Sequence, residues 1–115
     1  MAKENKVLWI SQEEAIQCGA LDMNFIMNNV ICANKMLGRG ETIEIPLFHM
    51  MWEEGKHAGK RIGLHACIIN SDTEDIHIAG VKEIPSNPAN PRKLGKPRSN
   101  GLVELFDEDT GYPIA

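Results

Sequence analysis

The sequence lacks several features that would assign it to a class at once. None of its apolar runs approaches the roughly 20 residues needed to cross a bilayer, and its first residues do not form the apolar segment of a secretion signal. Basic residues are outnumbered, with 12 Lys and Arg against 16 Asp and Glu, which disfavours a nonspecific nucleic-acid binder or a basic membrane-surface module. We therefore expect a cytoplasmic protein whose partners are neither nucleic acids nor membranes.

Cysteine and catalytic motifs are scarce as well. Cys18, Cys32 and Cys67 are odd in number and widely spaced among apolar neighbours, a pattern typical of reduced thiols in a core rather than of a disulfide framework. There is no CxxC pair, and the four histidines show no ligand spacing, so no metal site is expected. The nucleophile-elbow, dinucleotide and P-loop patterns are also missing, which predicts no catalytic residues and no cofactor site in this chain.

The 115 residues suffice for one domain or part of one, and 43% hydrophobic with 24% charged residues is an ordinary globular composition. Near the start, Ser11 and Glu14 have the spacing of a capping box, which predicts a short helix ending near Gly19. Asp22 is the N-cap candidate of a longer helix that Gly38 ends in a left-handed conformation. Four apolar residues of this helix recur at helical spacing and should face the core: Ile26, Val30, Ala33 and Leu37.

From residue 42 onwards the apolar period changes to two, which is typical of half-buried strands. We predict strands near 43–52, 61–70, 76–84 and 101–106, a long loop over 85–97, and the start of another strand at 112–115. Pro46 indicates an edge strand or a bend in the first of them. Two helices followed by strands with short turns predict an α+β fold, with the helices packed on a mainly antiparallel sheet. Because the sequence stops directly after a turn, we expect a longer parent protein whose sheet continues.

Lys82 is the residue with the clearest chemical interest. Strand alternation places it on the same face as Ile76, Ile78 and Ile84, where an ammonium group needs an anion or strong acceptors. The alternative is a solvated lysine whose stem lies on the sheet while its head reaches water. The basic loop that follows, with Arg92, Lys93, Lys96 and Arg98, is better explained as a solvated surface than as a phosphate site.

Several short segments are spread along almost the whole chain: Trp9-Ile10-Ser11, Gly19-Ala20-Leu21-Asp22-Met23, Ala79-Gly80-Val81-Lys82, Ser86-Asn87-Pro88, Gly95-Lys96-Pro97-Arg98, Leu105-Phe106-Asp107 and Thr110-Gly111-Tyr112-Pro113-Ile114-Ala115. The most specific of them are the A-G-x-K strand and the D-x-x-T-G-x-P-x-A turn. Together these segments resemble the N-terminal part of the ornithine cyclodeaminase and mu-crystallin family. The resemblance implies that residues 1–115 form most of the first half of a substrate-binding and dimerisation domain. It also implies a cytoplasmic homodimer with a separate Rossmann domain for NAD or NADP, which this chain lacks.

The resemblance further implies an amino-acid substrate whose α-hydride passes to the nicotinamide, with Lys82 holding the substrate carboxylate. The family places a second carboxylate-binding arginine just after a proline on an earlier strand, and the matching residue here is Phe48, beside His49. The family's M-P-A segment falls near His65, which is also changed. We therefore expect Lys82, Arg61 and His65 to be the substrate-binding candidates, with Arg61 as a replacement positive charge. A noncatalytic binding or oligomerisation module of the mu-crystallin type is the alternative.

Overall fold

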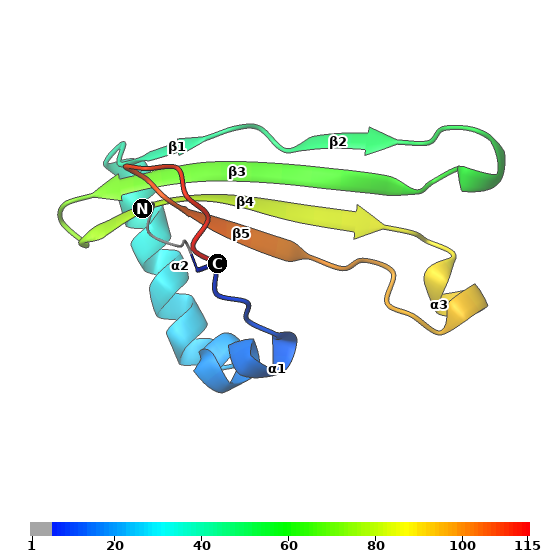
Figure 1. Ribbon diagram of the computed structural model, residues 1–115, viewed down its shortest axis with the longest axis horizontal. Coiled ribbons are helices and arrows are strands. Elements are labelled where there is room, and N and C mark those ends of the chain that lie inside the picture. Colours follow the sequence, from blue (N-terminus) through cyan, green and yellow to red (C-terminus); the bar gives the residue numbers. More distant parts are fainter. Residues whose placement is uncertain (1–5) are drawn as a thin grey trace.

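The computed structural model describes residues 6–115 and has the α+β architecture that the sequence predicts, with N-terminal helices and an antiparallel sheet (Figure 1). Helix α1 is Gln12–Ala15, continued by a π-helical turn at Ile16–Ala20, and α2 is Met23–Gly38. No helix in the described part of the chain is long and apolar enough to cross a membrane.

Local hydrogen bonds explain where the two helices begin. The Glu14 amide donates to Ser11 Oγ at 3.3 Å, and the Ser11 amide donates to Glu14 Oε2 at 2.8 Å, so the predicted capping box is confirmed. Asp22 Oδ1 accepts from two amides of the first turn of α2, at 3.0 and 3.1 Å, which confirms this N-cap. The end of α2 differs from the prediction, because Gly38 is still helical and the left-handed residue is Gly40, at φ 73°.

Within the described residues the sheet has five antiparallel strands in the order β1-β3-β4-β5, with β2 also paired to β3. The strands are β1 Thr42–Glu44, β2 Phe48–Met51, β3 Arg61–Ser71, β4 Ile76–Ser86 and β5 Leu102–Asp107, and a short 3-10 turn at Gly55–His57 connects β2 to β3. The predicted strand at 43–52 is therefore divided in two around Pro46, because proline cannot donate a ladder hydrogen bond.

Two further segments, helix α3 and the residues after β5, complete the fold. The predicted loop at 85–97 contains the short helix α3, Asn90–Leu94, which has a proline in its first turn and ends at the left-handed Gly95. The segment after β5 runs along the edge of the sheet, with the Ile114 amide donating to Leu105 O at 2.9 Å and the Leu8 amide donating to Ile114 O at 2.9 Å. The predicted strand start at 112–115 thus pairs with β5.

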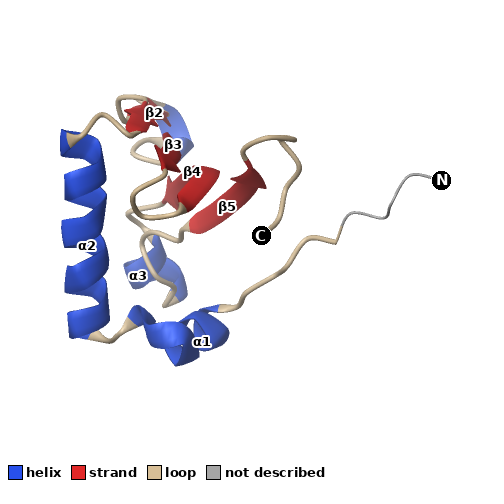
Figure 2. Cartoon of the chain, turned by 90° about the vertical axis from the view of Figure 1, so that its left-hand side faces the viewer, coloured by secondary structure: helices blue, strands red, loops and turns tan. Residues whose placement is uncertain are grey.

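The helices lie on one side of the sheet and leave its other face uncovered (Figure 2). The apolar face of α2 that we expected to be buried is not: Val30 and Leu37 remain 49% and 50% exposed, while Met36 is only 3% exposed. The reason is that only the C-terminal end of α2 lies against the sheet, whereas the N-terminal part of the helix projects away from the sheet (Figure 1). The three cysteines are free, as predicted, but Cys18 is exposed rather than part of a core.

The chain exposes far more surface than a closed domain of its size. Its accessible area is 9374 Å², against roughly 6,300 Å² for a typical folded monomer of this mass. Its radius of gyration is 17.1 Å, against roughly 13 Å for a compact domain of this length. Much of the apolar surface that would form a core in a closed domain is therefore available for contact with other protein surface.

Candidate functional site

The sheet brings the three predicted site residues to one face. His65 on β3 lies directly opposite Lys82 on β4, and Lys82 lies opposite Val103 on β5. Arg61 is four residues before His65 on the same strand, so strand alternation places it on this face too. We call this the lysine face, defined by Arg61, His65 and Lys82. Its relation to the helices follows from Ser71, which belongs to the same face and donates to Glu41 Oε2 at 2.7 Å just after α2.

The side chain of Lys82 is exposed, although Ile78 and Ile84 on the same face are half-buried. Within residues 6–115, no carboxylate forms an ion pair with Lys82, Arg61 or His65. Lys82 does not itself line the apolar pocket beside β5. Its cross-strand neighbour Val103 does, and side chains of such neighbours are typically about 5 Å apart at Cβ.

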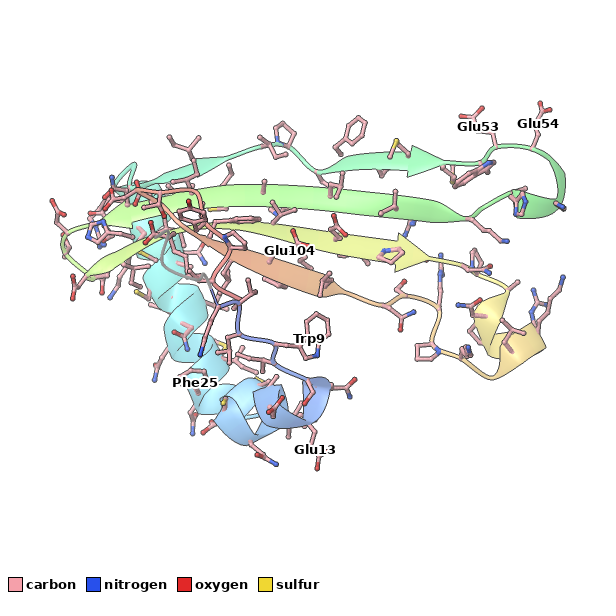
Figure 3. The ribbon with its side chains drawn as sticks, viewed as in Figure 1. Trp9, Glu13, Phe25, Glu53, Glu54 and Glu104 are labelled. Carbon is pink, nitrogen blue, oxygen red and sulfur yellow. The ribbon has the colours of Figure 1, made fainter. Side chains whose placement is uncertain are left out.

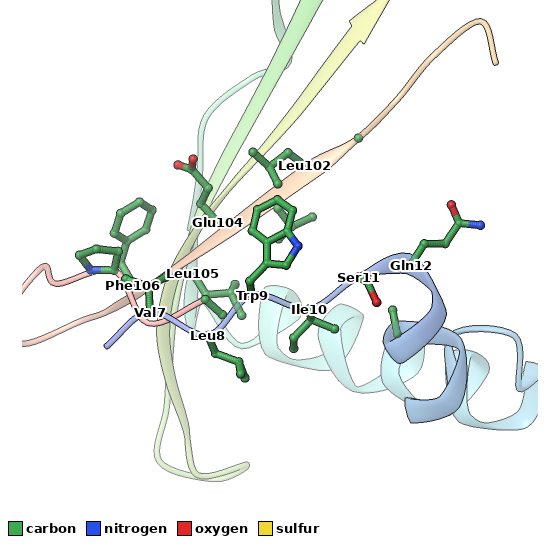
Figure 4. Close-up of a pocket in the computed structure, with 15 residues that line it drawn as sticks. Val7, Leu8, Trp9, Ile10, Ser11, Gln12, Leu102, Glu104, Leu105 and Phe106 are labelled. Atoms are coloured by element: carbon green, nitrogen blue, oxygen red, sulfur yellow. The ribbon is translucent and has the colours of Figure 1, made fainter. Parts of the chain in front are cut away.

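That pocket has a volume of about 790 Å³ and lies between the N-terminal segment and β5 (Figure 4). Its walls are mainly apolar and include Trp9, Ile10, Val103, Leu105 and Pro113. Trp9 is 74% exposed and lies between β5 and α1 (Figure 3). An open apolar pocket beside an unpaired lysine suits a small molecule that carries both an anionic group and an apolar part.

Gly80 explains how closely β5 approaches the lysine face. A Cβ placed on Gly80 would lie 3.2 Å from Leu105 Cδ2 and 3.3 Å from Glu104 O, both tighter than an ordinary contact. Only glycine therefore fits here without a shift of β5. Leu105 also lines the pocket, so Gly80 links the position of the pocket wall to the strand that carries Lys82.

The register of β2 changes the interpretation of the missing arginine. Phe48 lies opposite Leu64 and so faces away from Lys82, whereas His49 lies opposite Gly63 and belongs to the lysine face. Sequence matching had drawn attention to Phe48 and left His49 unassigned. Strand alternation counted along residues 48–51 places these two residues on opposite faces, but only the pairing with β3 decides which of them faces Lys82.

Cys67 lies two residues from His65 on the lysine face, but its environment does not favour a nucleophile. Burial, and secondarily the nearby Glu44 carboxylate, raise the pKa of the Cys67 thiol, so the reactive thiolate is disfavoured. Among residues 6–115, no three His, Cys, Asp or Glu side chains are grouped so as to hold a metal ion.

The strongest electrostatic network lies at the other end of the sheet. Arg39 Nε donates to Glu41 Oε1 at 2.7 Å, and Arg39 Nη2 donates to Glu74 Oε1 at 3.0 Å. Hydrogen bonds from Arg39 and Ser71 lower the pKa of Glu41 to about 2. This network fastens the end of α2 to the β3–β4 turn, so we assign it a structural role.

The comparisons with known proteins add no family to this geometry. No protein-family model matches the chain, and no curated protein matches it.

Proposed function

We propose that this chain is the substrate-binding and dimerisation part of an ornithine cyclodeaminase-like protein that acts on an amino acid or its imine. The observation that carries the proposal is the lysine face, where Arg61, His65 and Lys82 share one surface beside an apolar pocket and have no acidic partner among residues 6–115. The A-G-x-K and D-x-x-T-G-x-P-x-A segments support the choice of this family, because they are the most specific part of the resemblance.

In this proposal the Lys82 ammonium donates to the substrate carboxylate, a charge-assisted hydrogen bond. The substrate's apolar part lies against Val103 and reaches towards Trp9 in the pocket. Holding the carboxylate at one point and the side chain at another fixes the orientation of the α-carbon between them. The chain's contribution is therefore the binding and orientation of the amino acid.

Hydride transfer would require NAD or NADP, which the family binds on a Rossmann domain. This sequence has no G-x-G-x-x-G fingerprint, and the sheet of residues 6–115 is antiparallel rather than built from βαβ units. The residues present do not fit a dinucleotide, so the cofactor and the redox step belong to another part of the parent protein. We place that protein in the cytoplasm, in agreement with three unpaired cysteines.

The uncovered side of the sheet supports dimerisation. We call it the apolar face after its apolar residues, which include Ile43, Phe48, Met50, Ile62, Leu64, Ala66 and Ile68. Phe48 and Met50 are 54% and 53% exposed. The accessible area in excess of a closed monomer is roughly 3,000 Å², and a stable interface needs only about 800 Å² from each partner. A second copy placed face to face would cover this surface.

The alternative is a noncatalytic oligomerisation module of the mu-crystallin type. It is favoured by the apolar face together with Phe48 at the position where the family has its arginine. In that case the chain would self-associate without binding an amino acid. Ligand titration separates the two functions.

The test is a titration of the protein and its Lys82→Ala variant with a panel of amino acids. We expect Lys82→Ala to lose one charge-assisted contact, roughly 1.5–3 kcal/mol, which weakens amino-acid binding by one to two powers of ten. Lys93→Ala, in α3 and outside the strands that form the lysine face, is the matched control and should bind as the wild type does. Equal affinity of the wild type and Lys82→Ala would contradict the proposal.

A further inference from the structure

Gly63 occupies the centre of a group of basic side chains on the lysine face. Across the sheet its neighbours are His49 on β2 and Ile84 on β4. Along β3 its neighbours on the same face are Arg61 and His65, two residues before and after it. Three of the four positions around Gly63 therefore carry a nitrogen donor.

The space next to Gly63 has room for a small group and is bordered by Leu47 and by the Ile84 backbone. A Cβ placed there would meet only Leu47 Cδ1 at 3.9 Å and the Ile84 carbonyl oxygen at 4.0 Å, both ordinary van der Waals distances. Gly63 does not have a positive φ, so the backbone does not require glycine at this position. The absence of a side chain leaves room for a small group between His49, Arg61 and His65.

Among residues 6–115, no acidic residue of the strands alternates onto this part of the lysine face. Glu83 and Glu104 alternate onto the apolar side of the sheet. Glu44 and Asp107, which alternate onto the lysine face, lie opposite Cys67 and Ile78, further towards the β3–β4 turn. Glu41, which accepts from Ser71, lies at that end as well. Asp107 is also engaged with Thr110, whose amide donates to it at 2.8 Å.

We propose that the space over Gly63 is the carboxylate subsite of the amino acid, with His49 and Arg61 as its donors alongside His65 and Lys82. This inference rests on the proposed function and deepens it. Arginine presents paired N–H donors suited to a carboxylate, and the histidine ring adds a donor from the neighbouring strand. The family has its arginine at the position of Phe48. In this proposal the next residue, His49, replaces that arginine as a carboxylate donor on the lysine face.

The subsite leads to a specific expectation for two variants. Gly63→Val fills the space with a side chain that strands accommodate well, and His49→Ala removes one donor without altering the strand. Both should weaken binding of the carboxylate group in particular. Gly63→Ala, with a single methyl group in the same space, should have an intermediate effect.

The experiment is an NMR chemical-shift titration with L-alanine and with L-alaninamide, which lacks the carboxylate. We expect the wild type to prefer L-alanine, and expect His49→Ala and Gly63→Val to lower its affinity for L-alanine at least tenfold while leaving the amide unaffected. The control is His77→Ala, because His77 lies on the opposite face near the β3–β4 turn. Backbone amide spectra establish that each variant is folded.

The outcomes separate this inference from the proposed function. If Lys82→Ala loses L-alanine while His49→Ala and Gly63→Val bind it as the wild type does, the subsite over Gly63 is wrong and the proposed function stands. If the wild type does not distinguish L-alanine from L-alaninamide, both are wrong.

Discussion

Gly80→Ala tests whether the close contact between β4 and β5 positions the pocket wall. The new methyl group would lie 3.2 Å from Leu105 Cδ2 and 3.3 Å from Glu104 O. The leucine side chain is half-buried and can move, but the carbonyl oxygen belongs to the strand backbone and cannot move without disturbing the ladder. Overpacking of this kind costs about 1–3 kcal/mol.

The same substitution also removes freedom from the unfolded chain, which stabilises the folded state by about 0.4–1 kcal/mol. We therefore expect a net loss of about 1 kcal/mol in the free energy of unfolding, measured by urea denaturation at a fixed protein concentration. Gly63→Ala is the matched control, because its methyl group would have no contact closer than 3.9 Å. It should be neutral or more stable by up to about 1 kcal/mol.

Leu105→Ala in the Gly80→Ala background separates the two contacts. Removing the leucine side chain relieves the 3.2 Å contact but leaves the 3.3 Å contact with Glu104 O. The double variant should therefore show a favourable coupling energy without full recovery of stability. Equal stability of Gly80→Ala and Gly63→Ala would refute the assignment of Gly80 to close packing against β5.

Three further predictions address other parts of the fold. Asp22→Ala should cost about 1 kcal/mol of stability through loss of the N-cap of α2, whereas Asp22→Asn should retain it, as thermal unfolding would show. Arg39 and Ser71 lower the pKa of Glu41 to about 2 from an ordinary 4.5, so its contribution to stability is present above about pH 4.5 and is lost as the pH falls towards 2. Glu41→Gln should flatten acid unfolding in that range, and an unchanged acid curve would contradict this account. Phe48→Asp should convert the proposed dimer to a monomer in sedimentation velocity; a dimer that persists would exclude this face as the interface.

The sequence alone determined the elements whose signals are local. Caps beside an apolar pattern predicted both helices, because the first amides of a helix need acceptors from nearby side chains. Alternation predicted the strands, and the bend at Pro46 followed from its missing donor. Alternation also placed Lys82 on the face of three isoleucines, since successive side chains of a strand point to opposite faces.

Only the tertiary structure decided what lies beside what. The pairing of β2 with β3 places His49, rather than Phe48, on the lysine face, and this register is a property of two strands together. The exposure of Val30 on α2 could not be predicted from the helical period either. That period shows that a helix has an apolar face but not which surface covers this face. The space at Gly63 is free of a side chain because the residue is glycine, and only the pairing of three strands shows which side chains surround it.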